Sequence, residues 1–133
     1  MNHFYGEGFC YNEMWVQGSG DAGKAAADFI SSSNPLSDAP KPGEGPSRES
    51  RENGNYDVLF CGDIDEQSVH VSVKGDMDPG YGSTSKMISE SAICLVKECE
   101  DLHGGIYTPA PAMGTKLIQR LQDNAGLTFK IEN

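Results

Sequence analysis

The sequence is poor in positive charge, with ten lysines and arginines against twenty aspartates and glutamates and a formal net charge of −10 over 133 residues. Nucleic acids and anionic membranes bind proteins through exposed basic side chains, so this deficit argues against both as partners. No apolar run approaches the roughly 20 residues that span a bilayer. The first residues also lack the basic start and the apolar centre of a secretory signal.

The cysteines lack any spacing that would indicate a metal site or a disulfide framework. There are four, Cys10, Cys61, Cys94 and Cys99, and no two of them form a C-x-x-C pair. We therefore expect no zinc site. Cys94 and Cys99 fall five residues apart on a predicted helix, which points them in different directions. The simplest interpretation is a set of reduced, mostly buried thiols in a cytoplasmic protein.

Hydrophobic residues are also scarce, at 37%, whereas the chain holds 16 glycines and 7 prolines. The length fits one domain with a modest core. This composition predicts a loop-rich domain, or one that completes its core against another surface. Residues 31–55 form the longest irregular stretch, in which only residues 46–52 suggest a helical turn. A loop of this length in a small domain is functional, disordered or wrapped on a partner.

The stretch Gly18–Gly23 fits the G-x-G-x-x-G pattern of a dinucleotide-binding turn and precedes helix-like residues 24–30. That fingerprint requires a strand before it and a second strand after its helix. The aromatic residues 3–17 predict a short strand or an extended arm, but their alternation is broken. Serines and a proline stand where the second strand should begin. The stretch is either a dinucleotide-binding turn or a flexible turn that caps a short helix. Both interpretations stay open, and we favour the second.

Two strands are predicted with clarity, over residues 56–61 and 67–74. In the second strand, Val69, Val71 and Val73 point to one face and the polar residues to the other, so one face packs and the other meets water or a neighbouring surface. The acidic residues 62–66 predict a hairpin loop; they could hold calcium, but the EF-hand spacing is absent and a solvated loop is favoured. His70 on the polar face is a candidate acid or base, or an ordinary surface histidine.

The residues from Gly75 to Val96 predict a strand end, a tight turn and the longest helix. Asp78-Pro79-Gly80 is typical of a turn, and the hydroxyls of Ser83, Thr84 and Ser85 are suited to cap the helix that follows. Helical spacing places five residues on one predicted apolar face, namely Ile88, Ala92, Leu95, Val96 and Cys99. A glycine-rich turn before a helix can bind an anion, or it can be a plain junction.

The rest of the chain predicts a brief strand at residues 106–107 and a rigid extended loop over residues 108–114, because residues before proline avoid the α region. A second helix follows, with apolar residues inward (Leu117, Ile118 and Leu121) and polar residues outward (Lys116, Arg120 and Gln122). Residues 127–131 predict a terminal strand. Together the elements indicate an α+β fold with a small mixed, largely antiparallel sheet and two main helices on one face.

Three motifs resemble a known family. V-K-G-D-M-D-P-G-Y-G-S-T-S-K-M at Val73–Met87 is followed by G-G-I-Y-T-P-A-P-A-M-G at Gly104–Gly114, and then by L-I-Q-R-L and G-L-T-F. This succession resembles the carboxyl-terminal part of saccharopine dehydrogenase-like oxidoreductases, within a subgroup that includes trans-acting enoyl reductases. The resemblance spans roughly residues 43–131.

The resemblance implies that residues 1–133 are a single second domain, which in the family closes the substrate cleft and often contributes to dimer contacts. Family members carry a Rossmann domain that binds NAD(P), and these residues do not supply one. The resemblance thus implies NAD(P) for a full-length member, no cofactor bound by this chain, and the missing Rossmann domain as its partner in cis or in trans. It carries no catalytic residue onto this sequence.

Two hypotheses follow. In the first, the chain is the substrate-side or assembly domain of an NAD(P)-dependent oxidoreductase and does not catalyse alone. The turn at residues 76–85 and the loop at residues 108–114 would then form a rim for a small anionic or carbonyl substrate. The expected substrate-binding residues are Asp78, Tyr81, Ser83, Thr84 and Thr108. In the second, the chain is a structural module that pairs with a second copy through an exposed sheet face and its aromatic arm.

Overall fold

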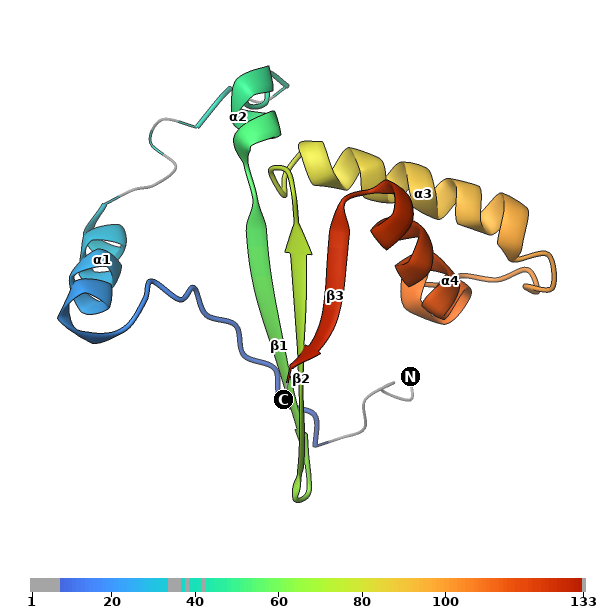
Figure 1. The fold of residues 1–133 in the computed structure, drawn as a ribbon, viewed down its shortest axis with the longest axis horizontal. Helices are drawn as coiled ribbons and strands as arrows, with labels where there is room; N and C mark the ends of the chain where they lie inside the picture. The colour runs from blue at the N-terminus through green and yellow to red at the C-terminus, as the bar shows by residue number, and fades with distance from the viewer. Residues whose placement is uncertain (1–7, 34–36, 38, 42, 133) are drawn as a thin grey trace. The chain divides into compact units, whose positions relative to one another are not determined.

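A computed structural model describes residues 8–33, 37, 39–41 and 43–132 (Figure 1). The chain divides into two compact units, Met1–Pro40 and Lys41–Asn133, and each is described by itself. No helix in the described part is long and apolar enough to cross a membrane. The described residues also contain no cluster of three or more metal-binding side chains.

The first unit contains helix α1, Gly20–Ser32, which begins inside the glycine stretch. The helix is longer than predicted, because its three consecutive alanines favour helix and the backbone of Gly20, with φ of 65°, leads into it. No strand forms over residues 8–18, and residues 3–7 of the predicted arm lie outside the described residues. Phe9, Tyr11 and Trp15 are exposed.

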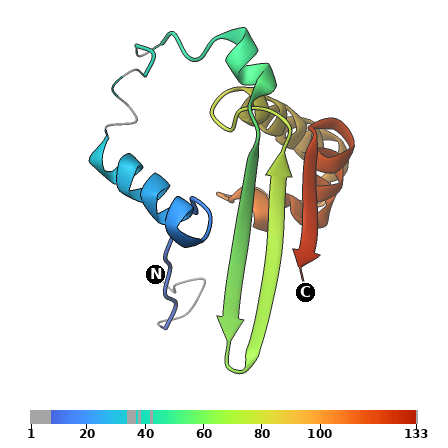
Figure 2. The same cartoon turned by 60° about the vertical axis from the view of Figure 1, so that its left-hand side comes forward.

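The second unit is built on a three-stranded antiparallel sheet in the order β1-β2-β3 (Figure 2). Its strands are β1 (Tyr56–Ile64), β2 (Gln67–Gly75) and β3 (Leu127–Glu132). The predicted five-residue loop is wrong, since β1 continues to Ile64 and only Asp65 and Glu66 form the turn. The positive φ of Asp65, 53°, lets so short a turn join two twisted strands. Before β1, helix α2 (Arg48–Asn53) supplies the predicted helical turn.

The sheet packs its apolar face against α3 (Gly82–Glu98) and α4 (Pro109–Asn124), which lie on the same side in Figure 2. Val73 pairs with Phe129 across the strands, and both contact the buried cluster between sheet and helices. The buried cluster consists of Cys94, Cys99, Met113, Leu117, Leu121, Ala125 and Leu127. The prediction of an α+β fold with two main helices on one face is therefore confirmed.

The helices cover only the end of the sheet nearest Gly75. Cross-strand pairing continues the apolar face toward the hairpin, but there the side chains are exposed by 41% to 71%. We call this the uncovered sheet surface; it consists of Val58, Phe60, Val69 and Ile131. The valines of β2 thus share one face as predicted, but that face is packed along only part of its length.

Helix α4 overturns the prediction of an extended loop over residues 108–114. The helix begins at Pro109, because the first turn needs no amide hydrogen from proline and tolerates its fixed φ. Gly114, with φ of 52° and ψ of −133°, then kinks the helix. Residues 106 and 107 are irregular rather than a strand. Leu117 and Leu121 are buried as predicted, whereas Ile118 is 39% exposed.

Helix α3 presents a different side to the core from the one predicted. Ile88 and Val96 are 68% and 78% exposed, while Cys94 is fully buried. Cys94 and Cys99 lie in the same core cluster rather than pointing apart, whereas Cys10 and Cys61 are exposed. Burial raises the pKa of the Cys94 thiol, and the neighbouring Cys99 adds to the increase. Both core thiols therefore act as small apolar groups.

Candidate functional site

The turn between β2 and α3 is organised by the carboxylate of Asp78. Its Oδ1 accepts hydrogen bonds from the amides of Gly80 and Tyr81, each at 3.0 Å, and its Oδ2 accepts one from the amide of Gly82 at 2.5 Å. The Tyr81 amide is the main cause that lowers the pKa of Asp78, partly opposed by desolvation. Asp78 therefore caps the start of α3, since charged acceptors satisfy the free amides of a helix start.

The hydroxyls predicted to cap α3 bond elsewhere. Ser83 is fully buried and shares a 2.8 Å hydrogen bond with the Tyr56 hydroxyl of β1. Thr84 donates to the carbonyl oxygen of Pro79, and Ser85 donates to that of Gly82. The amides of Gly80, Tyr81 and Gly82 are occupied by Asp78, so of the two interpretations of this turn the structure favours the plain junction over an anion site.

Helix α2 is fixed to the same turn. The amide of Asp78 donates to the carbonyl oxygen of Arg51 at 3.0 Å, and the amide of Ser83 donates to the carbonyl oxygen of Asp78 at 2.9 Å. Gly54 ends α2 so close to the turn that an added Cβ would lie 2.6 Å from the Asp78 nitrogen. The backbone therefore holds α2 and the start of α3 at a fixed separation.

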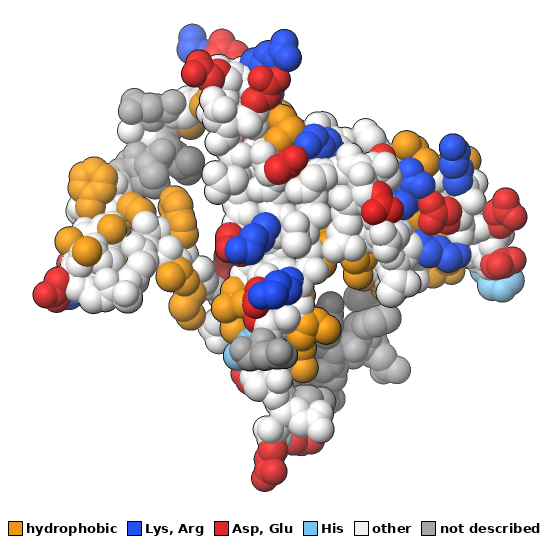
Figure 3. All heavy atoms as spheres, in the orientation of Figure 1, with side chains coloured by type: hydrophobic (Ala, Val, Ile, Leu, Met, Phe, Trp, Pro, Cys, Tyr) orange, Lys and Arg blue, Asp and Glu red, His pale blue; other side chains and the backbone are white. Residues whose placement is uncertain are grey.

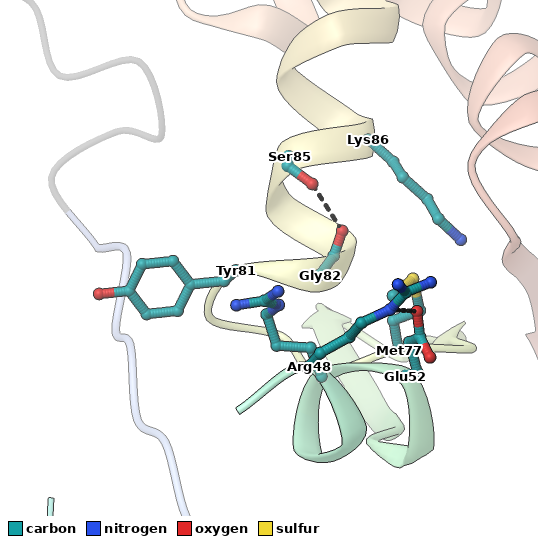
Figure 4. A pocket seen from close by; sticks show the side chains of 8 residues that line it. Arg48, Glu52, Met77, Tyr81, Gly82, Ser85 and Lys86 are labelled. Atoms are coloured by element: carbon teal, nitrogen blue, oxygen red, sulfur yellow. Dashed lines mark hydrogen bonds and ion pairs between the residues drawn. The ribbon is translucent and has the colours of Figure 1, made fainter. Parts of the chain in front are cut away.

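A hollow of about 430 Å³ lies between α2 and the start of α3 (Figure 4). Its lining combines basic, apolar and hydroxyl groups from Arg48, Arg51, Glu52, Met77, Tyr81, Gly82, Ser85 and Lys86. We call it the α2–α3 hollow. Figure 3 shows the basic and acidic side chains gathered over α2 at the top of the view. The Tyr81 ring lies against Gly45, where an added Cβ would be 3.3 Å from the ring.

The expected substrate-binding residues fall into two places. Asp78 and Tyr81 lie in the turn before α3, Ser83 and Thr84 lie in the first turn of α3, and of these four only Tyr81 lines the α2–α3 hollow. Thr108 precedes α4, beyond the far end of α3, and the 17 residues of α3 correspond to a length of about 25 Å. The structure therefore does not bring Thr108 to the rim predicted for it. Substrate binding by these residues stays a prediction.

A second hollow, of about 370 Å³, lies beside the kink of α4. It is lined by Cys99, Asp101 and Leu102 after α3 and by Pro111 to Lys116 on α4. Thr108 is not among the lining residues. This hollow brings fewer charged side chains together than the α2–α3 hollow does, and it offers less chemistry for orienting a ligand.

Arg120 is a half-buried residue that no sequence motif indicates. Its Nη2 lies 2.6 Å from Glu90 and its Nη1 2.7 Å from Glu98, so one guanidinium of α4 joins two carboxylates of α3. The hydrogen bond to Glu98, followed by that to Glu90, raises the pKa of Arg120. Helical periodicity assigned Arg120 to the outer side, and the signal that could have found it is the spacing of Glu90 and Glu98, eight residues apart on one helix face.

The glycine stretch at the start of α1 does not fit a dinucleotide. An added Cβ at Gly23 would lie 2.5 Å from the carbonyl group of Gly18, so the backbone of the turn packs closely at this glycine. The described residues before it form no strand, and the three strands of the sheet belong to the second unit. This stretch therefore lacks the strand-turn-helix context of the dinucleotide fingerprint.

No family model and no solved structure matches the chain. Curated proteins do match: a candidate trans-acting enoyl reductase of Mycobacterium tuberculosis is 36% identical over 85 residues. The trans-acting enoyl reductases of Mycobacterium ulcerans and Mycobacterium bovis are 34% and 32% identical over 84 residues. The chain is similar to trans-acting enoyl reductases. Each match covers 62% of this chain but only 20% of the relative, so the chain spans about a fifth of these reductases.

Proposed function

We propose that the chain is the substrate-side or assembly domain of an NAD(P)-dependent oxidoreductase of the saccharopine dehydrogenase-like type, acting in the cytoplasm and catalytically incomplete by itself. The observation that carries the proposal is the match to trans-acting enoyl reductases over 62% of this chain and a fifth of their length. In this proposal NAD(P) is bound by a Rossmann domain, in cis or in trans, and not by these residues.

Two features of the fold support a domain that works against another part of a protein. The uncovered sheet surface continues the core without a break, and apolar surface of this kind is typical of a face that another body covers. The α2–α3 hollow lies at one end of the sheet and collects polar and charged groups able to orient a substrate. The chain thus offers a packing surface and a polar site, which suits the substrate side of a two-part enzyme.

The test is an exchange of segments in the Mycobacterium ulcerans reductase. The matched segment of that enzyme is replaced by the matching residues of this chain, and reduction of its substrate is followed as NADPH oxidation. We expect the chimera to keep activity within about tenfold of the parent, and a parent lacking the segment to lose it. A parent that stays active without the segment would overturn the proposal.

Isothermal titration of this chain with NADPH provides a second readout, and tight binding would contradict the assignment of the nucleotide to another domain.

The second candidate is a self-associating module without a redox role. The uncovered sheet surface favours it, because flat apolar faces are common in homodimer interfaces. Static light scattering over a range of protein concentrations separates the candidates. A mass that stays at one chain throughout removes the self-associating module, whereas a concentration-dependent dimer supports it.

A further inference from the structure

We propose that the α2–α3 hollow binds an anionic oxygen group, a phosphate or a carboxylate, through Arg48, Arg51 and Lys86. The inference rests on the proposed function, because it names the part of the substrate that this domain would hold. It also differs from the anion site expected at the turn before α3, since Asp78 fills that turn and the cations lie outside it.

The charge of the hollow is opposite to that of the chain. Three of the ten basic residues line it with a single acid, Glu52, which gives the lining a charge of +2 in a chain of −10. Each cation also has an acid near it: Glu52 pairs with Arg48, Asp76 pairs with Lys86, and Arg51 interacts with Asp78. A bound anion would therefore add to these pairs through the donors that they leave open. Figure 4 shows Arg48 and Lys86 reaching from α2 and α3 toward the same side of the hollow.

The cations keep donors for a ligand. Arg48 uses Nε for its 2.7 Å bond to Glu52, and no described residue accepts a hydrogen bond from its Nη1 or Nη2. Arg51 uses Nη1 for the carbonyl oxygen of Pro46, which leaves Nη2. The Lys86 ammonium lies 3.1 Å from Oδ1 of Asp76. An ammonium has three N–H donors, so this pair does not use all of them. Guanidinium groups with two open nitrogens match the geometry of carboxylate and phosphate oxygens.

The walls of the hollow are fixed before any ligand binds. The bond from the Asp78 amide to the Arg51 carbonyl oxygen ties α2 to the turn, and the Asp78 carboxylate holds the first residues of α3. Tyr81 is set against Gly45 and lends an aromatic surface beside the cations. A preorganised site spends less of its binding free energy on ordering side chains, which favours a specific ligand over diffuse screening by ions.

The experiment is a titration of the full chain, labelled with nitrogen-15, followed by amide chemical shifts at pH 7 and constant ionic strength. Sodium phosphate, sodium acetate and sodium chloride are compared as probes. We expect saturable shifts at the amides of α2 and the start of α3 with phosphate or acetate, and none with chloride. Phosphate alone indicates a phosphate-bearing substrate, and acetate alone indicates a carboxylate.

Arg48→Gln is the variant of choice, because the Arg48 side chain is 83% exposed and pairs only with Glu52 among described residues, so its loss leaves the fold intact. We expect it to weaken anion binding about tenfold, the order that a charge-assisted hydrogen bond contributes. Lys74→Gln is the matched control, since Lys74 is also exposed and paired with an acidic residue, Asp57, but does not line the hollow. Equal weakening by both variants, or shifts no larger than those of chloride, would overturn the site. Neither result depends on the activity of the chimera, so the two proposals fail separately.

Discussion

Helices α3 and α4 pack against each other, yet their sequences relate to the core in opposite ways. In α4 the apolar residues with helical spacing, Leu117 and Leu121, are buried. In α3 most of the predicted apolar face lies outside: Ile88, Leu95 and Val96, which we call the stripe of α3, are exposed. Only Cys99 from that face joins the core, and the buried residues within the helix are Gly82, Ser83 and Cys94. The stripe of α3 is therefore not part of the core of this unit.

The same periodic pattern is buried in α4 and mostly exposed in α3. Apolar spacing shows that a helix has a face suited to burial, but it does not show which body buries it. In α3 the side with small residues approaches α4, and the two glutamates on that side are matched by Arg120. The exposed residues of α3 are then available for contact with another surface, and the chain matches only a fifth of the reductases to which it is similar.

The comparison is tested most strongly by truncating one apolar residue on each helix. Leu121→Ala leaves a cavity among buried side chains, so we expect the free energy of unfolding to fall by about 2–5 kcal/mol. Ile88→Ala removes an exposed side chain, and we expect a change within about 0.5 kcal/mol. Urea denaturation followed by circular dichroism measures both. Similar losses for the two variants would show that the stripe of α3 belongs to the core after all.

The second test breaks the contact that sets the orientation of α3. Arg120→Met keeps the bulk of the side chain but leaves Glu90 and Glu98 without their partner, so we expect a clearly lower melting temperature at pH 7, with a smaller loss than in Leu121→Ala. The double variant Arg120→Met, Glu90→Gln removes one of the stranded charges and should recover part of the loss. No recovery would mean that Arg120 acts through packing alone.

Much of the sheet could be predicted from the sequence, because side chains that alternate between apolar and polar show both that a segment is a strand and which side chains share a face. Val69, Val71 and Val73 share a face as expected, and Leu127–Glu132 forms the last strand. The cap of α3 could not be predicted in the same way, since three hydroxyl residues stand at the expected positions while the aspartate that caps the helix precedes them. Hydroxyls are good caps, but a nearby carboxylate accepts several amides at once.

The site residues named from the sequence stay a prediction. Turn chemistry indicated Asp78, which organises the turn before α3, and Tyr81 lines the α2–α3 hollow, but Thr108 lies beyond the other end of α3. Arg48 and Arg51 were not singled out, because α2 and α3 are separated by the hairpin and only the folded chain brings their cations together. Contacts of this kind depend on tertiary structure, and no local pattern encodes them.

A third prediction concerns acid stability at the turn. The amide of Tyr81 lowers the pKa of Asp78 below its ordinary value of 3.8, so the stabilisation is fully present above that value and is lost as the pH falls through the lowered pKa. In Asp78→Asn the free energy of unfolding should therefore be lower at neutral pH and should change less with acidification. Urea denaturation across this acidic range measures the slope. The control is Glu132→Gln, whose pKa is lowered by Lys130 and Ser72 away from the turn.

The smallest expected effect on stability separates the two exposed apolar surfaces. Phe60→Gln alters the uncovered sheet surface and Val96→Gln alters the stripe of α3, and both side chains are more than half exposed. We expect each to change the free energy of unfolding by only about 0.5 kcal/mol, because neither loses a buried contact. If the chain dimerises, only Phe60→Gln should weaken the dimer in light scattering, because the uncovered sheet surface contains only apolar residues, whereas Lys97 adjoins Val96 on the helix. Weakening by Val96→Gln instead would place the partner on α3, and the two helices would then differ because one of them forms the interface.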